Sequence, residues 1–192
     1  MTKIENTLEI LILQHPQEKS KDLATAPVLV QSLSRCQIRV GLSWANLAKA
    51  VGRPVDPKKW GVLFVGSQAS SQKIKSIPQG LPLEGVIALD GNWSQAKALW
   101  WRNAWLLKLH RIVLNPKKPS LYNKLRREPR KNCISTLESV VSVLEMFGSE
   151  SDKKAASLLQ QKFEEFVAEK LLKAKSPHEP LPSRSSEETE KA

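Results

Sequence analysis

The stretch VIALDGNWSQAKALWW, residues 86–101, joins two patterns that belong to different kinds of secondary structure. Its first four residues are apolar, as expected of a strand buried on both faces, and Asp90-Gly91 follows them as a polar turn. Asn92, with Gln95 three positions later, has the pattern of a capping box at the start of a helix. The stretch therefore predicts a buried strand that turns directly into a helix, with a carboxylate at the junction.

The same change between apolar runs and helical patterns continues on both sides of this stretch. Short apolar or alternating runs predict strands at residues 8–13, 36–42, 61–66, 84–90 and 110–115. Helical spacing predicts helices at residues 24–35, 43–52 (with Ser43 as cap and Gly52 as stop), 93–107, 136–147 and 152–174. Strands that alternate with helices predict an α/β fold with a mostly parallel sheet flanked by helices.

The composition is that of a soluble globular protein, with 41% hydrophobic and 26% charged residues. We predict one folded domain at residues 1–175 and a disordered Pro/Ser/Glu-rich tail at 176–192. The two cysteines, Cys36 and Cys133, form no CxxC pair, so we expect neither a metal site nor a disulfide, and a cytoplasmic location. The sequence shows no signal-peptide pattern and no apolar run long enough to span a bilayer, so no membrane partner is expected.

The charge of the chain is strongly positive and unevenly placed. There are 30 Lys and Arg residues against 19 Asp and Glu, a net charge of +11. Residues 97–131 alone hold eleven of these bases and a single acid, Glu128. A basic surface concentrated in this way indicates a polyanionic partner, because neutralised phosphates release condensed counterions. We expect a nucleic acid rather than an anionic membrane, since this segment has no long amphipathic basic helix with a broad apolar face.

Two segments combine basic residues with aromatic rings, a mixture typical of proteins that hold single-stranded RNA. The basic loop at 116–131 contains Tyr122, the only tyrosine of the chain. The helix predicted at 93–107 carries two stripes of tryptophan with basic residues between them. We expect one stripe in the core and the other available for stacking on bases. The structural alternatives are a solvated loop and a wholly buried set of indoles.

Polar clusters follow three of the predicted strands, at residues 15–18, 66–68 and 90–93. Ligands of parallel α/β sheets bind beyond the carboxyl ends of the strands, so one pocket could collect all three clusters. The structural alternative is that connecting loops are polar in any case. Helix capping accounts for Asn92, but Asp90 precedes the cap by two residues. An acid that directly ends a buried strand is a candidate for catalysis.

A second capping box, Ser135 with Glu138, starts the helix predicted at 136–147. The structural interpretation of these two residues is strong, because a capping box needs no ligand. A helix N-terminus also binds carboxylate or phosphate groups readily. The same residues are therefore compatible with a place in a ligand pocket.

The order of these motifs resembles that of the DTW-domain family, which is named for its Asp-x-Thr-Trp motif. The resemblance runs from about residue 8 to residue 147 and is carried by LILQHPQE with LATAPVL, LDGNWSQAKALW and LYNKLRREPRKNCISTLESVVSVLE. Two departures stand out. Asn92 replaces the threonine of the motif, although both residue types cap helices. Many members also carry a four-cysteine zinc module that this sequence lacks, so no metal is expected.

The resemblance implies a tRNA-uridine aminocarboxypropyltransferase that uses S-adenosylmethionine on a SPOUT-like fold with a trefoil knot. In this reaction N3 of a uridine attacks the methylene carbon beside the sulfonium, not the methyl group, and methylthioadenosine leaves. N3 carries a proton and is a poor nucleophile at neutral pH. A positioned base would raise the rate by about 10²–10⁴-fold.

The resemblance also assigns roles to residues of this sequence. Asp90 is the expected catalytic base, and Trp93 is expected to line the methionine side chain. The residues expected to hold S-adenosylmethionine are His15, Glu18, Thr25, Gly66, Ser67, Leu89, Asn92, Ser135, Thr136 and Glu138. Those expected to hold tRNA are Arg102, Lys117, Lys118, Tyr122, Lys124, Arg126, Arg127 and Arg130.

Two other functions are compatible with the same residues. A SPOUT-type RNA methyltransferase would keep the fold and transfer the methyl group instead. A non-catalytic RNA-binding protein would use the basic loop only for docking. The sequence leaves open which uridine and which tRNAs are modified, and it favours a monomer only slightly.

Overall fold

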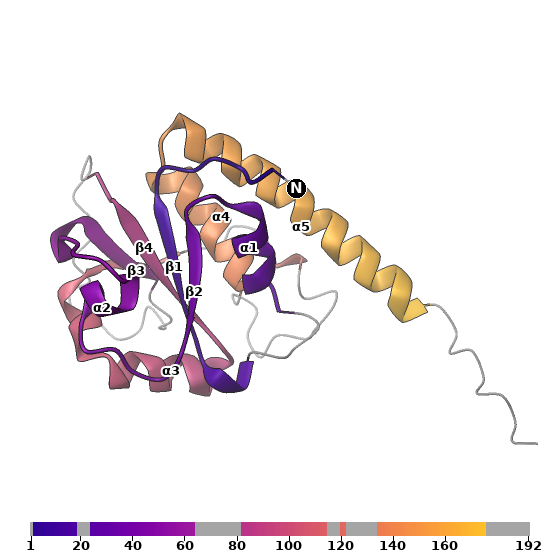
Figure 1. The fold of residues 1–192 in the computed structure, drawn as a ribbon. Coiled ribbons are helices and arrows are strands. Elements are labelled where there is room, and N and C mark those ends of the chain that lie inside the picture. The colour runs from indigo at the N-terminus through magenta and orange to yellow at the C-terminus, as the bar shows by residue number, and fades with distance from the viewer. Residues whose placement is uncertain (1, 19–23, 64–81, 115–119, 122–133, 176–192) are drawn as a thin grey trace, which may run out of the picture.

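The computed structural model describes residues 2–18, 24–63, 82–114, 120–121 and 134–175, and its described strands form one sheet (Figure 1). The strands are β1 (Glu9–Gln14), β2 (Cys36–Val40), β3 (Trp60–Leu63), β4 (Gly85–Asp90) and β5 (His110–Ile112). Their order across the sheet is β2-β1-β4-β3-β5, and every neighbouring pair is parallel. The predicted α/β class with a parallel sheet is confirmed.

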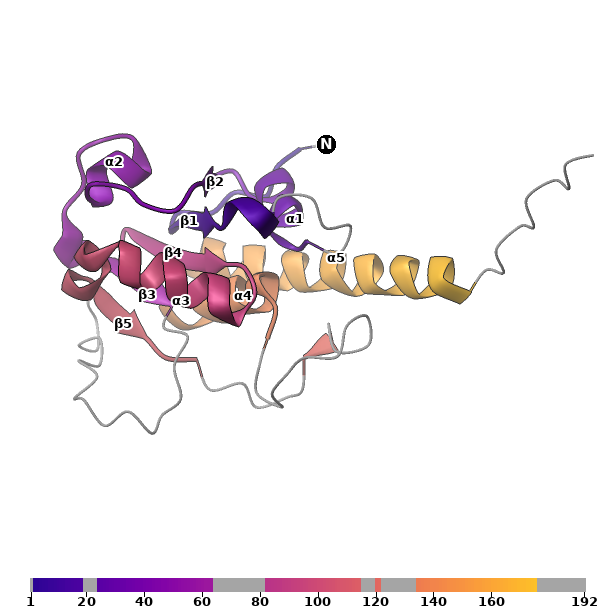
Figure 2. The same cartoon turned by 90° about the horizontal axis from the view of Figure 1, so that it is seen from below.

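Helices cover both faces of this sheet, and two apolar clusters fill the layers between them (Figures 1 and 2). One face is covered by α1 (Ala26–Ser32), α4 (Thr136–Phe147) and α5 (Glu150–Lys175), and the other by α2 (Leu47–Val51) and α3 (Trp93–Arg102). The described 3-10 helices are η1 (Pro16–Glu18), η2 (Pro57–Lys59) and η3 (Ala104–Lys108). In the part of the chain that the structure describes, no helix has both the length and the apolarity needed to cross a membrane.

The pleat of β1 and β4 decides which layer each side chain enters. Ile12 belongs to the cluster beneath α1 and α4, whereas Leu13 belongs to the cluster beneath α2 and α3. Because side chains alternate along a strand, Gln14 returns to the α4 side. Asp90 of β4 is the register partner of Gln14 and lies on the same side. The carboxyl ends of the two central strands therefore present two polar side chains together.

The helix predicted at 43–52 is shorter in the structure. Its cap is Asn46, whose side chain accepts a hydrogen bond from the backbone N–H three residues on (2.9 Å), so the prediction of Ser43 as the cap is wrong. Ser43 instead donates its hydroxyl to the carbonyl oxygen of Arg102 (3.2 Å), a tertiary contact. The predicted stop is confirmed, because Gly52 ends the helix with φ +93°, a left-handed conformation that favours glycine.

The helix predicted at 93–107 is interrupted at Asn103, so the prediction of one continuous helix is wrong. The buried amide of Asn103 donates to the carbonyl oxygens of Leu42 (3.0 Å) and Leu99 (2.8 Å). Its oxygen accepts the backbone N–H of Trp44 (2.8 Å). These bonds hold the segment after β2 against the end of α3, and the chain continues as η3.

Several sequence predictions lie outside the described residues. They concern the last part of the strand predicted at 61–66, most of the basic loop at 116–131, and the tail at 176–192. The connections that follow β3 and β5 also lie largely outside the described residues. The trefoil knot that the resemblance implies therefore stays a prediction.

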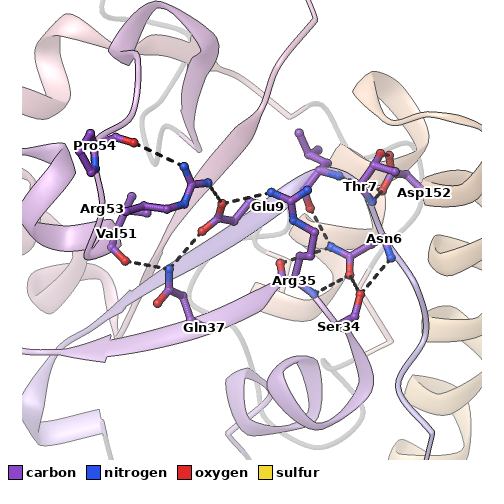
Figure 3. Close-up of polar contacts among 11 residues, drawn as sticks. Asn6, Thr7, Glu9, Ser34, Arg35, Gln37, Val51, Arg53, Pro54 and Asp152 are labelled. Carbon is purple, nitrogen blue, oxygen red and sulfur yellow. Dashed lines mark hydrogen bonds and ion pairs between the residues drawn. The ribbon is translucent and has the colours of Figure 1, made fainter.

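The carboxylate of Glu9 fastens the amino end of β1 to its neighbours (Figure 3). It is buried and accepts hydrogen bonds from the guanidinium groups of Arg35 (3.5 Å) and Arg53. The side-chain amide of Gln37 donates a further hydrogen bond (3.2 Å). The two guanidinium groups thus neutralise the charge of this acid, and the amide of Gln37 helps to anchor it.

Asp152, in the first turn of α5, joins this helix to the segment before β1 (Figure 3). Its carboxylate accepts the backbone N–H groups of Thr7 (2.7 Å), Leu8 (3.1 Å) and Ser149 (2.8 Å), and the hydroxyls of Thr7 and Ser149. Burial raises the pKa of this carboxyl, but hydrogen bonds from Thr7, Ser149 and Leu8 outweigh burial and hold the pKa of Asp152 below its usual 3.8. The acid is therefore held in its charged form.

Candidate active site

Asp90 lies at the carboxyl end of β4, at the centre of the sheet, and is only 7% exposed. The amide of Gln14, its register partner on β1, donates a hydrogen bond to Oδ2 of Asp90 (2.7 Å). Gln14 is itself 4% exposed. The parallel pairing of β1 with β4 thus fixes one oxygen of the carboxylate.

Thr136, the first residue of α4, fixes the other oxygen. Its hydroxyl donates to Oδ1 of Asp90 (2.6 Å). The carboxylate therefore lies at the N-terminus of α4, where the helix dipole favours a negative charge. Each oxygen accepts one neutral donor and keeps a lone pair for another. Within the described residues no lysine or arginine pairs with Asp90, and the donors that orient its carboxylate there are both neutral.

The turn after β4 keeps a second predicted cluster beside Asp90. The backbone N–H of His15 donates to the carbonyl oxygen of Asp90 (3.0 Å). Gly91 has φ +152°, a conformation that L side chains rarely adopt, and a Cβ there would lie 2.8 Å from Cβ of Gln95 and 3.4 Å from Cβ of His15. The buried Glu18 follows in η1, with its N–H bonded to the carbonyl oxygen of His15 (2.9 Å). The structure thus brings residues 15–18 and 90–92 together.

Both predicted capping boxes are confirmed. Asn92 accepts the N–H of Gln95 (3.0 Å), and the Gln95 side chain accepts the N–H of Asn92 (2.7 Å). Ser135 and Glu138 form the equivalent pair at the start of α4. Glu138 also accepts the hydroxyl of Ser120 (2.6 Å) and the N–H of Leu121 (2.8 Å). The side chains of these capping residues therefore fix the N-termini of α3 and α4, the two helices next to Asp90.

Of the four remaining residues expected to bind S-adenosylmethionine, the structure describes two. Leu89 is buried in the cluster beneath α2 and α3, so only its backbone faces the edge of the sheet. Thr25 is buried before α1 without capping it, and no hydrogen bond among the described residues joins it to Asp90. Gly66 and Ser67 lie outside the described residues. Their roles stay predictions.

Of the residues expected to hold tRNA, the structure describes Arg102, which is exposed at the end of α3. The others lie outside the described residues: Lys117, Lys118, Tyr122, Lys124, Arg126, Arg127 and Arg130. Among the described residues, no three His, Cys, Asp or Glu side chains form a group that could hold a metal ion.

Gln14 is the residue of this site that the sequence did not single out. It ends an apolar run one position before the cluster at 15–18, so its place along the chain was visible. Its function depends on the pairing of β1 with β4, which lie 76 residues apart at this contact. Apolar periodicity defines strands, but it does not say which strands pair.

The structure places this protein in the class of parallel α/β proteins. Its candidate site is a buried, oriented acid at the carboxyl edge of the sheet, with a capped helix on each side of that acid. The chain belongs to the DTW domain family, whose model matches residues 1–171. The resemblance inferred from the sequence motifs is thus confirmed.

The chain is similar to three relatives that are each named tRNA-uridine aminocarboxypropyltransferase 2. The protein of Macaca fascicularis is 28% identical over 138 residues, which cover 70% of this chain and 46% of the relative. That of Mus musculus is 27% identical over 145 residues, with 73% and 48% covered. That of Drosophila melanogaster is 28% identical over 145 residues, with 73% and 57% covered. This chain spans about half the length of these relatives, and no solved structure matches it significantly.

Proposed function

We propose that this protein transfers the 3-amino-3-carboxypropyl group of S-adenosylmethionine to N3 of a uridine in tRNA. The observation that carries the proposal is the carboxylate of Asp90, which is buried at the carboxyl edge of the sheet and held by Gln14 and Thr136. Membership of the DTW domain family, and the names of the three relatives, support this choice of reaction.

The proposed mechanism assigns the proton of uridine N3 to Asp90. As the carboxylate accepts that proton, N3 forms a bond to the methylene carbon beside the sulfonium. The bond between that carbon and sulfur breaks, its electron pair stays on sulfur, and neutral methylthioadenosine leaves. A base in this position contributes about 10²–10⁴-fold to the rate, or roughly 3–5 kcal/mol of barrier. Orientation of the two substrates has to supply the choice of methylene over methyl.

The residues around Asp90 fit a sulfonium substrate in charge and in layout. A carboxylate without a basic partner among the described residues is complementary to the positive sulfur. The N-terminus of α4 favours an anionic group such as the methionine carboxylate. The half-buried Trp93 at the start of α3 would line the methionine side chain. Backbone at Leu89 and at residues 66–67 would complete the pocket.

The proposal extends to the partner and the setting of the reaction. We assign the phosphates of tRNA to Arg126 and Arg127 in the basic loop, and we place the reaction in the cytoplasm. The SPOUT-like trefoil knot is part of the same proposal. A monomer suffices for the chemistry, because Asp90, Gln14 and Thr136 come from one chain.

The decisive experiment gives the purified protein tRNA and S-adenosylmethionine labelled either in the methyl group or in the carboxypropyl chain. The tRNA is then digested to nucleosides, and the mass and the label content of each nucleoside are measured. A uridine heavier by one aminocarboxypropyl group, labelled only from the carboxypropyl chain, supports the proposal. Label from the methyl group would assign the protein to the methyltransferases. Unmodified tRNA that remains bound would make it a docking protein.

A matched pair of variants connects the product to Asp90. Asp90→Asn should lower the rate of transfer by about 10²–10⁴-fold, because an amide at this position cannot accept the proton. Glu145→Gln removes an exposed acid from α4 and should leave transfer unchanged. Equal loss of transfer in both variants would contradict the assignment of the base.

A further inference from the structure

We infer that the outer face of α3 is a binding surface for single-stranded polynucleotide, with Trp101 stacking on a base and Lys97 and Arg102 contacting phosphates. The inference deepens the proposed function, because it names the surface that leads the substrate to Asp90. It rests on the exposure of Trp101, on the charge around it, and on the position of α3 directly after the turn that follows Asp90.

The indole of Trp101 differs from the other described indoles of this region in having no structural task. It is 74% exposed. Trp100, on the same helix, is half-buried with the guanidinium of Arg111 5.5 Å from its ring centre. Trp105 donates its ring N–H to the carbonyl oxygen of Trp44 (2.8 Å). Trp100 and Trp105 both pack against the core cluster, whereas Trp101 faces solvent. The prediction of a whole stripe available for stacking is therefore wrong, and of these three indoles only Trp101 is exposed.

The side chains around Trp101 leave its ring accessible and surround it with positive charge. Residues three, four and seven positions earlier share its face of the helix, and they are Ala98, Lys97 and Ser94. Two of these are small, and the third is an exposed base, as is the adjacent Arg102. Aromatic stacking beside basic side chains is how proteins hold single strands without strict sequence preference.

No acid opposes this charge along the segment. Residues 91–121 contain seven lysine, arginine and histidine residues and no aspartate or glutamate. The exposed acids Asp56 and Glu84 belong to the opposite edge, since they precede the amino ends of β3 and β4. A polyanion therefore meets only attractive charge along α3.

The position of α3 connects this face to the candidate active site. The helix starts directly after the turn that follows Asp90, and it runs along the lower edge of the sheet in Figure 1 and in front of the strands in Figure 2. Its far end meets the segment that follows β2, through the bonds of Asn103 to Leu42 and Trp44. Trp101 is eight residues beyond Trp93, about 12 Å along the axis. On the proposed function, a strand that contacts Trp101 would follow α3 back to its start, next to the carboxyl end of β4 where Asp90 lies.

The test measures binding separately from transfer. Bulk tRNA and a single-stranded oligouridylate are titrated against the wild type and the variants Trp101→Ala, Trp101→Phe and Trp101→Leu, without S-adenosylmethionine. We expect Trp101→Ala to lose roughly 5- to 150-fold in affinity, the range for one stacked base. Trp101→Phe should recover most of the loss, whereas Trp101→Leu, which is apolar without a ring, should not.

Charge variants provide an independent measurement. Lys97→Gln and Arg102→Gln should each make the slope of log affinity against log salt shallower by about 0.7, the value for one phosphate contact on a single strand. Lys154→Gln, an exposed site on α5 on the other face of the sheet, is the matched control and should leave the slope unchanged.

The outcomes separate this inference from the proposed function. RNA binding that depends on Trp101 in a protein without transferase activity would overturn the function and keep the surface. If Trp101→Ala still catalyses transfer and binds RNA with wild-type affinity, the proposed function stands and the inferred binding surface on α3 is wrong. Self-association or protein binding that Trp101→Ala abolishes, with RNA affinity unchanged, would also overturn the inference, because the occupant would then be a protein.

Discussion

The two ends of the sheet each bury a carboxylate, and the two acids have different partners. Glu9 at the start of β1 and Asp90 at the end of β4 are 8% and 7% exposed. Glu9 accepts two guanidinium groups, whereas Asp90 accepts one amide and one hydroxyl. A buried charge requires compensation, and guanidinium groups supply it at Glu9. Burial therefore does not distinguish these two acids, but their partners among the described residues do.

Asp152 sharpens this comparison, because its partners are also neutral. Five donors from Thr7, Leu8 and Ser149 use its oxygens, and three of them are backbone N–H groups. Asp90 has two side-chain donors and no backbone donor among the described residues. The number of donors among the described residues therefore distinguishes Asp152, which fastens α5 to the segment before β1, from Asp90, to which we assign the role of base.

The strongest test of the comparison is the pair Asp90→Asn and Glu9→Gln, assayed for transfer. Asp90→Asn should lower kcat by about 10²–10⁴-fold, since it removes the base. Its midpoint of unfolding should hardly change, because an amide of the same shape can still bond to Gln14 and Thr136. Glu9→Gln should retain kcat. A large drop in kcat for Glu9→Gln would erase the distinction between the two edges.

The next effect concerns stability at the amino edge. Asp152→Ala should lower the free energy of unfolding by about 3 kcal/mol, because it leaves the buried N–H group of Leu8 and the part-buried N–H groups of Thr7 and Ser149 without an acceptor. Urea titration followed by circular dichroism measures this change. Activity per folded molecule should stay at the wild-type value. Glu150→Ala, at an exposed position two residues earlier, is the control and should leave the free energy of unfolding close to the wild-type value, because water already solvates this acid and its ion pair.

Glu9→Gln should have a smaller effect on stability, about 1–2 kcal/mol, although it separates two ion pairs. Both arginine side chains are 49% exposed, so water can solvate them once the carboxylate is gone. The same urea titration provides the measurement. A loss as large as that of Asp152→Ala would mean that the two guanidinium groups are less hydrated than their exposure indicates.

Removal of one donor from Asp90 should alter its chemistry modestly. Thr136→Val keeps the shape of the side chain without the hydroxyl and should lower kcat about 10-fold, the equivalent of one hydrogen bond. Thr136→Ser should restore most of this loss, and its pH–rate profile should resemble that of the wild type. If Thr136→Val changes only KM, the hydroxyl contacts substrate and does not orient the base.

The smallest effect is the acid dependence of stability at Asp152. Its pKa lies below the usual 3.8 in the folded protein, so this acid adds stability at pH values above 3.8. That contribution is lost as the pH falls through the lower folded pKa. Unfolding measured between pH 5 and pH 2 should therefore depend less on pH in Asp152→Asn than in the wild type. Identical curves would show that other carboxyl groups govern acid unfolding.

The sequence predicted the parts of this molecule that local patterns determine. The strands around residues 8–13 and 84–90 and the boxes at Asn92 and Ser135 need only neighbours along the chain, and the structure confirms them. The position of Asp90 at the end of a buried strand followed from the same stretch.

Tertiary contacts determine what the sequence did not predict. Asn103 ends α3 because its side chain bonds to the segment after β2, about 60 residues away. Asn46 takes the place of Ser43 as a cap while Ser43 bonds to the end of α3. Gln14 orients Asp90 only because β1 and β4 are neighbours. Each of these contacts joins segments that no local pattern relates.

The central position of β4 has a consequence for the newly made chain. β1 and β2 can pair as soon as both have left the ribosome, but β3 has both of its partners, β4 and β5, later in the sequence. Until β4 inserts between β1 and β3, the sheet exists as separate parts, and such distant parallel pairing is slow to form. Asp90 arrives on that closing strand, and Thr136 arrives on a helix made later still. The nascent polypeptide therefore completes the hydrogen bonds of Asp90 only after Thr136, at the start of α4, has left the ribosome.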